Sequence, residues 1–410
     1  MSIDAIPSRV AEHERRYLNG TFAELCRIES PSGSERACAE RVIAELRALD
    51  VVADEDDSAL RAGSDCGNLL AWVPGDGADA RRARADDSRD AVADVGEGRA
   101  SLLLCAHLDT VPLLAPVEPV LVDGFWENEH AGVLGADNKA AVAVLLALAR
   151  HVRRHGAPVD LELLFTVGEE TALAGARAFD VAQLRSTRGY VFDHATPIGE
   201  VIVDSPTHFR IEAVFHGAAA HAGIRPEDGR SAILAAARAI ATLRLGRLDE
   251  QTTVNVGTIA GGTAMNVVPE RCAVVAEVRA MQDERAEAVV AEVVERMHEA
   301  ANLPECECDV DIAVQRTFAG FHLADSRPAV QLAERALRSC GYEPTRIASG
   351  GASDANELLA SGVEVVNLAN GTERNHEPQE RVSVAALEGM LDVGLALLDA
   401  AAEHPQDATR

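Results

Sequence analysis

Histidine and carboxylate residues gather in three short segments of this chain. The first is CAHLDTVP, which contains His107 and Asp109 and follows an apolar run. The second is GADNK, which contains Asp137 just before a helical pattern, and the third is GEE, with Glu169 and Glu170. Imidazole and carboxylate groups can hold a divalent metal ion or move a proton, so these segments indicate metal-assisted or acid–base chemistry.

Two single residues extend the set. Asp193 follows the apolar run Tyr190–Phe192, and His376 lies in the loop after the run Val363–Leu368. We interpret all these positions as lying at or just beyond the carboxyl ends of strands, the edge where open α/β sheets place their sites. We therefore expect the ligand-type residues to meet at one location.

Imidazole and carboxylate ligands favour zinc, with cobalt or manganese as alternatives, and they need no thiolate. A bridging carboxylate holds two ions roughly 3.5–4 Å apart, where together they polarise a carbonyl group. Two such ions would use five ligands, namely His107, Asp137, Glu170, Asp193 and His376. Glu169 is then left over as a general base, and Asp109 can accept the second N–H of the His107 imidazole.

Each piece has an ordinary interpretation when it is taken alone. An H-x-D triplet occurs by chance as a turn with a solvated aspartate, and Glu169–Glu170 could be a charged loop. Asp193 could be a turn residue and His376 a loop histidine. Their shared order and their placement after strands favour a single site.

The elements that must position these residues alternate between strands and helices. Helices are predicted at Val10–Cys26, Ala140–Arg150, Ala329–Ser339 and Val384–Ala401. Another helix is expected after Ser32, which has capping-box spacing to Glu35. The alternation predicts an α/β fold, with an open mixed sheet and helices on both faces. The charged, aperiodic segment 75–100 is interpreted as a solvated surface insertion.

Residues from about 208 to 317 change character and follow the order β-α-β-β-α-β, which is the ferredoxin-like plan. Because α/β elements resume at Pro328, this region interrupts the first domain. We expect a discontinuous catalytic domain at 1–206 and 321–410, and an inserted α+β domain at 207–320.

The composition excludes several classes of function. The chain has 410 residues, 47% of them hydrophobic, and a formal net charge of -28, so a nucleic-acid partner is not expected. No secretory signal or membrane-length apolar run is present, and eight scattered cysteines fit a reducing compartment, so we expect a cytoplasmic protein.

Lys139 is the single lysine of the chain. An acidic, lysine-poor chain suggests a halophilic origin, with a GC-rich genome as the alternative; full stability in low salt would contradict halophily.

A family resemblance rests on these motifs. HLDTVP, GADNKAA, GEE, a following aspartate and NxxxxNHEP resemble the M20 metallopeptidases, specifically the peptidase T-like branch, over nearly the whole chain. The resemblance implies a zinc-peptidase-like catalytic domain and a lid that also forms a homodimer. It implies that Asp137 bridges two zinc- or cobalt-like ions, with His107 and Asp193 on one ion and Glu170 and His376 on the other. It also implies that Glu169 is the base.

The inserted region adds residues whose roles come from the resemblance. His221 in GAAAHAG matches a histidine that reaches the active site of the partner subunit, whereas the sequence alone favours a surface histidine. Asn266 and Arg279 match positions that grip a substrate carboxylate or carbonyl, although Arg279 could equally form a surface ion pair. Gly351 belongs to a glycine-rich segment that matches the lining of the substrate pocket; alternatively, that segment is a turn capped by Ser353.

Three functions are compatible with these residues. The leading interpretation is two-metal hydrolysis of peptide bonds in short peptides, by an aminopeptidase or tripeptidase. An N-acyl-amino-acid deacylase, a desuccinylase or a carboxypeptidase of the same family would use the same ligands. A non-catalytic metal or peptide binder is the third interpretation, and the presence of Glu169 argues against it.

Overall fold

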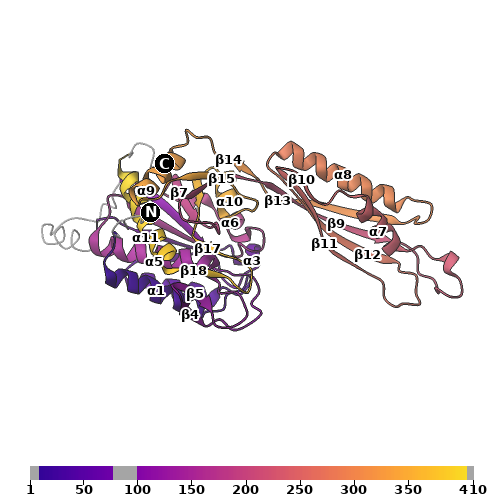
Figure 1. Cartoon of the computed structure of the whole chain (residues 1–410), viewed down its shortest axis with the longest axis horizontal. Coiled ribbons are helices and arrows are strands. Elements are labelled where there is room, and N and C mark those ends of the chain that lie inside the picture. The colour runs from indigo at the N-terminus through magenta and orange to yellow at the C-terminus, as the bar shows by residue number, and fades with distance from the viewer. Residues whose placement is uncertain (1–8, 77–98, 404–410) are drawn as a thin grey trace. The chain divides into compact units, whose positions relative to one another are not determined.

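The computed structural model describes residues 9–76 and 99–403, and it divides into two compact units (Figure 1). Unit 1 comprises the described residues up to Val203, Leu323–Ala348 and the described residues from Ser353 onward. Unit 2 comprises Asp204–His322 and Ser349–Ala352. Most of the expected insertion at 75–100 lies outside the described residues.

A nine-stranded mixed sheet has its centre in unit 1, in the order β1-β2-β6-β3-β7-β16-β8-β14, with β15 beside β8. β14 and the last two residues of β8, which pair with each other, are counted in unit 2. The four middle strands, β6, β3, β7 and β16, are parallel, and the neighbours β2 and β8 run antiparallel to them. This confirms the predicted open mixed sheet. The strands are β1 (Ala53–Glu55), β2 (Leu69–Val73), β3 (Ser101–His107), β6 (Asp160–Thr166), β7 (Arg188–Phe192), β8 (Glu200–Ser205), β14 (Phe321–His322), β15 (Thr345–Ala348) and β16 (Glu364–Leu368).

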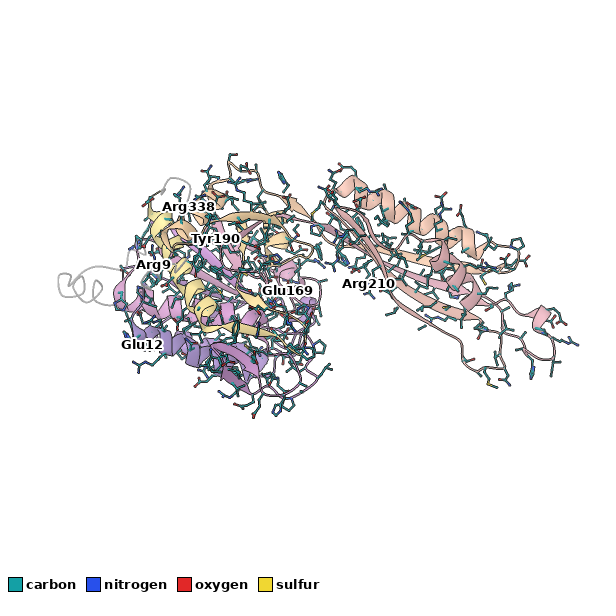
Figure 2. All side chains as sticks on the ribbon, in the orientation of Figure 1. Arg9, Glu12, Glu169, Tyr190, Arg210 and Arg338 are labelled. Carbon is teal, nitrogen blue, oxygen red and sulfur yellow. The ribbon has the colours of Figure 1, made fainter. Side chains whose placement is uncertain are left out.

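Helices cover both faces of this sheet because its middle strands are apolar on both sides. Leu103 and Cys105 of β3 pack in one cluster with Ala355 and Leu358 of α10. The alternate residues of these strands face the opposite side, where the buried Tyr190 of β7 donates a hydrogen bond to the carbonyl oxygen of Ala329 in α9 (Figure 2). α5 also packs against β3, and it contacts α1 and α11.

The helices of unit 1 are α1 (Glu12–Cys26), α2 (Arg36–Arg47), α3 (Ala59–Ala62), α5 (Ala136–His155), α6 (Ala174–Ala178), α9 (Pro328–Ser339), α10 (Asp354–Ala360) and α11 (Val384–Ala402). The middle of α5, from Ala140 to Ala149, is buried on all sides. A helix that is apolar all round belongs inside a protein, which explains its central position.

A second, four-stranded sheet was not predicted. Its order is β17-β18-β5-β4, and all its pairings are antiparallel. The strands are β4 (Pro119–Val122), β5 (Phe125–Asn128), β17 (Thr372–Glu373) and β18 (Arg381–Ser383). Strands of two to four residues carry too little alternation to be recognised in a sequence.

The expected capping box at Ser32 is wrong. α2 begins at Arg36, and its N-cap has no side-chain hydrogen bond. Ser32 Oγ instead donates to Asp109 Oδ2 at 2.6 Å, and the buried Glu35 accepts the backbone N–H of Gly168 at 3.1 Å. Both side chains thus bind the segments that follow β3 and β6, because buried polar groups there need partners.

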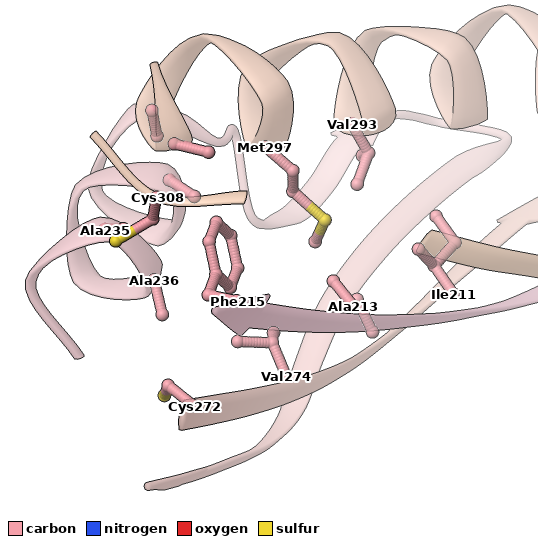
Figure 3. Packing of buried hydrophobic residues seen from close by; sticks show 14 of the residues in the cluster. Ile211, Ala213, Phe215, Ala235, Ala236, Cys272, Val274, Val293, Met297 and Cys308 are labelled. Carbon is pink, nitrogen blue, oxygen red and sulfur yellow. The ribbon is translucent and has the colours of Figure 1, made fainter. Parts of the chain in front are cut away.

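Unit 2 has the ferredoxin-like order with one added edge strand. Its five-stranded antiparallel sheet runs β10-β11-β12-β9-β13. The elements are β9 (Thr207–His216), α7 (Ala232–Thr242), β10 (Gly246–Asp249), β11 (Thr252–Gly261), β12 (Arg271–Ala280), α8 (Asp283–Ala301) and β13 (Asp309–Phe318). Figure 3 shows Val293 and Met297 of α8 packed over Phe215 and its neighbours on β9.

No helix in the described ranges is both long and apolar enough to cross a membrane. All eight cysteines are free thiols, and seven of them are buried.

Two glycines in helices of unit 1, Gly175 in α6 and Gly20 in α1, should have opposite effects on stability when each is replaced by alanine. A Cβ on Gly175 would lie 2.1 Å from the carbonyl oxygen of Val167, just before the GEE segment, whereas a Cβ on Gly20 in α1 meets nothing within 4 Å. Gly175→Ala should therefore destabilise the protein by about 1–3 kcal/mol through overpacking against backbone. Gly20→Ala should stabilise it by about 0.5–1 kcal/mol. Thermal unfolding midpoints measure both, and equal midpoints for the two variants would contradict this packing.

Candidate active site

Three adjacent parallel strands bring the first group of predicted residues together. His107 is the last residue of β3 and pairs in register with Thr166, so Glu169 and Glu170 follow just beyond the end of β6. On the other side Cys105 pairs with Val191 of β7, and the same register places Asp193 beside His107. Figure 2 marks Glu169 within unit 1. The ends of β6, β3 and β7 thus form one edge, as parallel strands require.

Asp137 and His376 reach this edge from outside the main sheet, which corrects the expectation that every site residue follows one of its strands. Asp137 lies at the start of α5, where it and Asn138 have non-helical backbone angles. His376 lies between β17 and β18 of the small sheet and has a positive φ of 67°. The main sheet alone therefore cannot complete the site.

The Asp137 carboxylate lies between the two histidines. Its Oδ1 is 3.3 Å from His107 Nε2, and its Oδ2 is 3.3 Å from His376 Nε2. Around this pair, Asp193 Oδ1 lies 3.8 Å from His107 Nε2, and Glu170 Oε1 lies 2.8 Å from His376 Nε2. Asp137 thus presents one carboxylate oxygen to each histidine, which is the arrangement expected of a carboxylate that bridges two metal ions. Two three-residue sets at this site have ligand atoms within 4.8 Å of one another, His107–Asp137–Glu170 and His107–Glu169–Asp193.

Asp109 contacts the imidazole of His107, as predicted, and also the backbone of the GEE segment. Its backbone carbonyl oxygen lies 3.0 Å from His107 Nδ1, and its carboxylate Oδ1 lies 3.3 Å from the same nitrogen. The carboxylate also accepts the backbone N–H groups of Glu169 and Glu170, at 3.0 and 3.1 Å. One buried aspartate thus orients the histidine and also fixes the backbone of both glutamates.

Glu380 is a site residue that the sequence reasoning missed. Its buried carboxylate accepts three backbone N–H groups, from Leu134, Gly135 and Asp137, each at 2.8 Å. It therefore fixes the irregular start of α5 that presents Asp137. The available signal was a carboxylate two residues beyond the end of the NxxxxNHEP motif that contains His376.

Other partners of the site also escaped the sequence reasoning. Asn375 donates to Asp137 Oδ2 at 2.9 Å. The side-chain amide of Asn367 in β16 bonds the backbone of Asp193 twice: its Oδ1 accepts the N–H of Asp193 and its Nδ2 donates to the carbonyl oxygen. Lys139, the single lysine, follows Asp137 by two residues, is buried and donates to the carbonyl oxygen of Ile28.

The acidic groups of the site repel one another. Burial, and then the neighbouring Asp137 carboxylate, raise the pKa of Asp193 to about 7. Burial and the charge of Asp193 hold the pKa of Glu169 well above its usual range. In contrast, the hydrogen bonds that the His376 ring donates to the carboxylates of Asp137 and Glu170 raise the pKa of His376 to about 10. The site therefore favours added positive charge.

The donor set fits divalent metal ions. Four carboxylates and two imidazoles converge, and within the described ranges no arginine or lysine forms an ion pair with Asp137, Glu169, Glu170 or Asp193. Buried carboxylates without compensating charge are unfavourable, and metal coordination is one of the two ways that proteins compensate them. Oxygen and imidazole donors suit zinc, cobalt or manganese.

The remaining predicted residues belong to unit 2. His221 is exposed, and its Nδ1 accepts the N–H of Gly223 at 3.1 Å. Asn266 is exposed nearby, since its carbonyl oxygen accepts the N–H of Ala222. Arg279 bonds Glu277 and the carbonyl oxygen of Gly350, and the carbonyl oxygen of Gly351 accepts a bond from Ser205. These residues thus form two small groups. One contains His221 and Asn266, and the other contains Arg279 and the segment Gly350–Gly351.

Comparison with known proteins identifies the family of this chain. The family profile described as a peptidase dimerisation domain matches residues 207–303, and that of peptidase family M28 matches residues 91–195. The structure of aminopeptidase PepT from Bacillus cereus is 32% identical, with a TM-score of 0.79, over 95% of this chain and 99% of that one. A Staphylococcus aureus tripeptidase structure is 28% identical, with a TM-score of 0.83, over 95% and 99%. Acetylornithine deacetylase from Myxococcus xanthus is 30% identical over 71% of this chain and 78% of that protein.

The fold and the site together define a metal-dependent hydrolase of peptide or related amide bonds. Within that class, the chain belongs to the M20 family of metallopeptidases, in its peptidase T-like branch.

Glu380 should control metal affinity without being a ligand. Glu380→Gln replaces one acceptor oxygen by an amide N–H group that faces backbone donors, so the segment presenting Asp137 should loosen. We expect metal affinity to fall about 10–100-fold, the usual cost of losing such a support. Titration with a metal-buffering chelator measures it. Glu373→Gln, which changes an exposed glutamate paired with Arg381, is the matched control and should bind as the wild type does. Equal affinities in the two variants would refute the role of Glu380.

Proposed function

We propose that this protein hydrolyses peptide bonds in short peptides, as a two-metal aminopeptidase of the tripeptidase type. The observation that carries the proposal is the Asp137 carboxylate, which presents one oxygen to His107 and the other to His376. The similarity to an aminopeptidase and a tripeptidase over nearly the whole chain supports the same substrate class.

The five proposed metal ligands divide between two ions, with Asp137 shared. His107 and Asp193 would hold one ion, and Glu170 and His376 the other; zinc is the expected metal, with cobalt or manganese as alternatives. When bound, such ions polarise the scissile carbonyl group and acidify water. Asp109 and Glu380 hold the ligand-bearing segments in place through backbone N–H groups, so the geometry exists before a substrate arrives.

Glu169 is the proposed general base. Its backbone and that of Glu170 are fixed by the same aspartate, yet their side chains serve different groups. Glu170 contacts His376, whereas Glu169 lies near His107 and Asp193. A carboxylate in this position can take the proton from the attacking water and later give it to the departing nitrogen.

Unit 2 supplies the proposed groups for substrate recognition. The Arg279 guanidinium suits a carboxylate of the substrate, and Gly351 offers polar contacts beside it. Asn266, which lies near His221, is the other proposed contact to the substrate. We further propose a homodimer in which His221 of one subunit donates to the tetrahedral oxyanion in the other. The match of residues 207–303 to a peptidase dimerisation domain and the exposure of His221 support this arrangement.

A substrate panel tests the proposed activity. We expect metal-dependent release of the N-terminal residue from tripeptides, and about 10²–10⁴-fold less turnover in Glu169→Gln with metal content unchanged. N-acyl amino acids form the second panel, because the similarity to acetylornithine deacetylase favours that alternative. Cleavage of acylated amino acids alone would replace the peptidase assignment. Wild-type turnover by Glu169→Gln would refute the base, and binding of peptides without cleavage would indicate a non-catalytic binder.

Mixed dimers test the shared site. His221→Ala should lower turnover about 10²–10³-fold without metal loss, the usual cost of removing one oxyanion donor. Dimers that combine His221→Ala with Glu169→Gln subunits should regain activity, because one of their two sites then has both groups intact. His216→Ala, which changes another exposed histidine of unit 2, is the control. Absence of recovery in verified mixed dimers would contradict a contribution across subunits.

A further inference from the structure

The far end of α5 carries a second group of metal-ligand side chains. α5 begins beside the active site with Asp137 and ends with His151 and His155, which are four residues apart and so lie on one face of the helix. Glu14, in the first turn of α1, lies against both histidines. At least fourteen residues separate these histidines from Asp137, which is about 20 Å along a helix, so the two groups share no ligand.

A single carboxylate oxygen faces both rings. Glu14 Oε1 lies 2.8 Å from His151 Nδ1 and 3.5 Å from His155 Nε2, and the two ring centroids are 4.7 Å apart. One ligand atom of each of the three residues lies within 4.8 Å of the others. The second oxygen, Glu14 Oε2, accepts the backbone N–H of Ala11 at 3.1 Å. Glu14 is therefore anchored to the backbone by one oxygen and presents the other to the two imidazoles.

Burial and charge distinguish this group from an ordinary surface ion pair. Glu14 is 5% exposed, whereas the His155 side chain is 51% exposed. In the part of the chain that the structure describes, no arginine or lysine forms an ion pair with Glu14. A buried carboxylate is unfavourable without a compensating charge. One cation held by the carboxylate and both imidazoles would supply that charge, and solvent can reach it past His155.

We propose that Glu14, His151 and His155 bind a divalent transition metal ion of the zinc, cobalt or nickel type. Two histidines four residues apart on a helix, with a carboxylate from a second element, are a ligand set that zinc accepts. Water fills the remaining position on the exposed side. The ion ties α1 to α5, which already pack together, and it has a structural role distinct from the catalytic ions.

Zinc content of the full-length protein tests this site. Protein stripped with a chelator is equilibrated with Zn²⁺ at a fixed free concentration, and bound zinc is counted by elemental analysis. We expect the double variant His151→Ala/His155→Ala to hold one equivalent less than the wild type. His13→Ala, which removes an exposed histidine from the same turn of α1, should hold as much as the wild type. Zinc bound at the active site contributes equally to the zinc content of all three proteins, so the difference between them counts only the proposed second site. Equal zinc content in the double variant and the wild type would overturn the proposal.

A second measurement covers the case in which the double variant does not fold. Crystals of the wild type soaked in Zn²⁺ are expected to show an anomalous-scattering peak within coordination distance of Glu14, His151 and His155. His155→Gln, a milder change at the exposed ligand, should weaken that peak. Zinc at the active site with no peak at this cluster would overturn the proposal while leaving the proposed hydrolase activity intact.

Discussion

Mutual repulsion of buried carboxylates is the constraint on which the site of this protein depends. Asp137, Asp193, Glu169 and Glu170 meet at one edge of the sheet, and their charges oppose one another. Such a cluster is unfavourable unless cations occupy it. The fold therefore has to hold these side chains together against their own repulsion, and much of the surrounding hydrogen bonding serves that purpose.

Backbone N–H groups supply a large part of this support. Asp109 accepts from Glu169 and Glu170, and Glu380 accepts from the segment that carries Asp137. Each of these carboxylates thus fixes the backbone of a proposed ligand or base instead of its side chain. A ligand held through its backbone keeps its position when the metal is absent, which lowers the cost of assembling the site.

The two sheets of unit 1 position different residues of the site. The parallel middle strands of the large sheet align His107, Glu169, Glu170 and Asp193 because the ends of these adjacent strands coincide. The small sheet brings the His376 loop to the same place, since β18 pairs with β5 and β17. α5 joins these parts, for it packs on β3 and presents Asp137 at one end. Its other end contacts α1 through His151 and Glu14, so this helix connects the site to the outer layer of the unit.

Local pattern in the sequence determined the long elements, the sheet class and the order of unit 2, because strong apolar periodicity and helix length are visible without tertiary contacts. The motifs likewise indicated the ligand types.

Tertiary structure alone decided the short strands of the second sheet and the partners of several buried polar side chains. β17 and β18 are too short to show a period, and they exist because they pair with β5. Ser32 and Glu35 matched a capping box, yet they bind the buried segments after β3 and β6, where an unpaired polar group would cost more than an uncapped helix. Glu380 acquires its role from three N–H groups more than 240 residues away, and no local pattern can encode a partner at that distance.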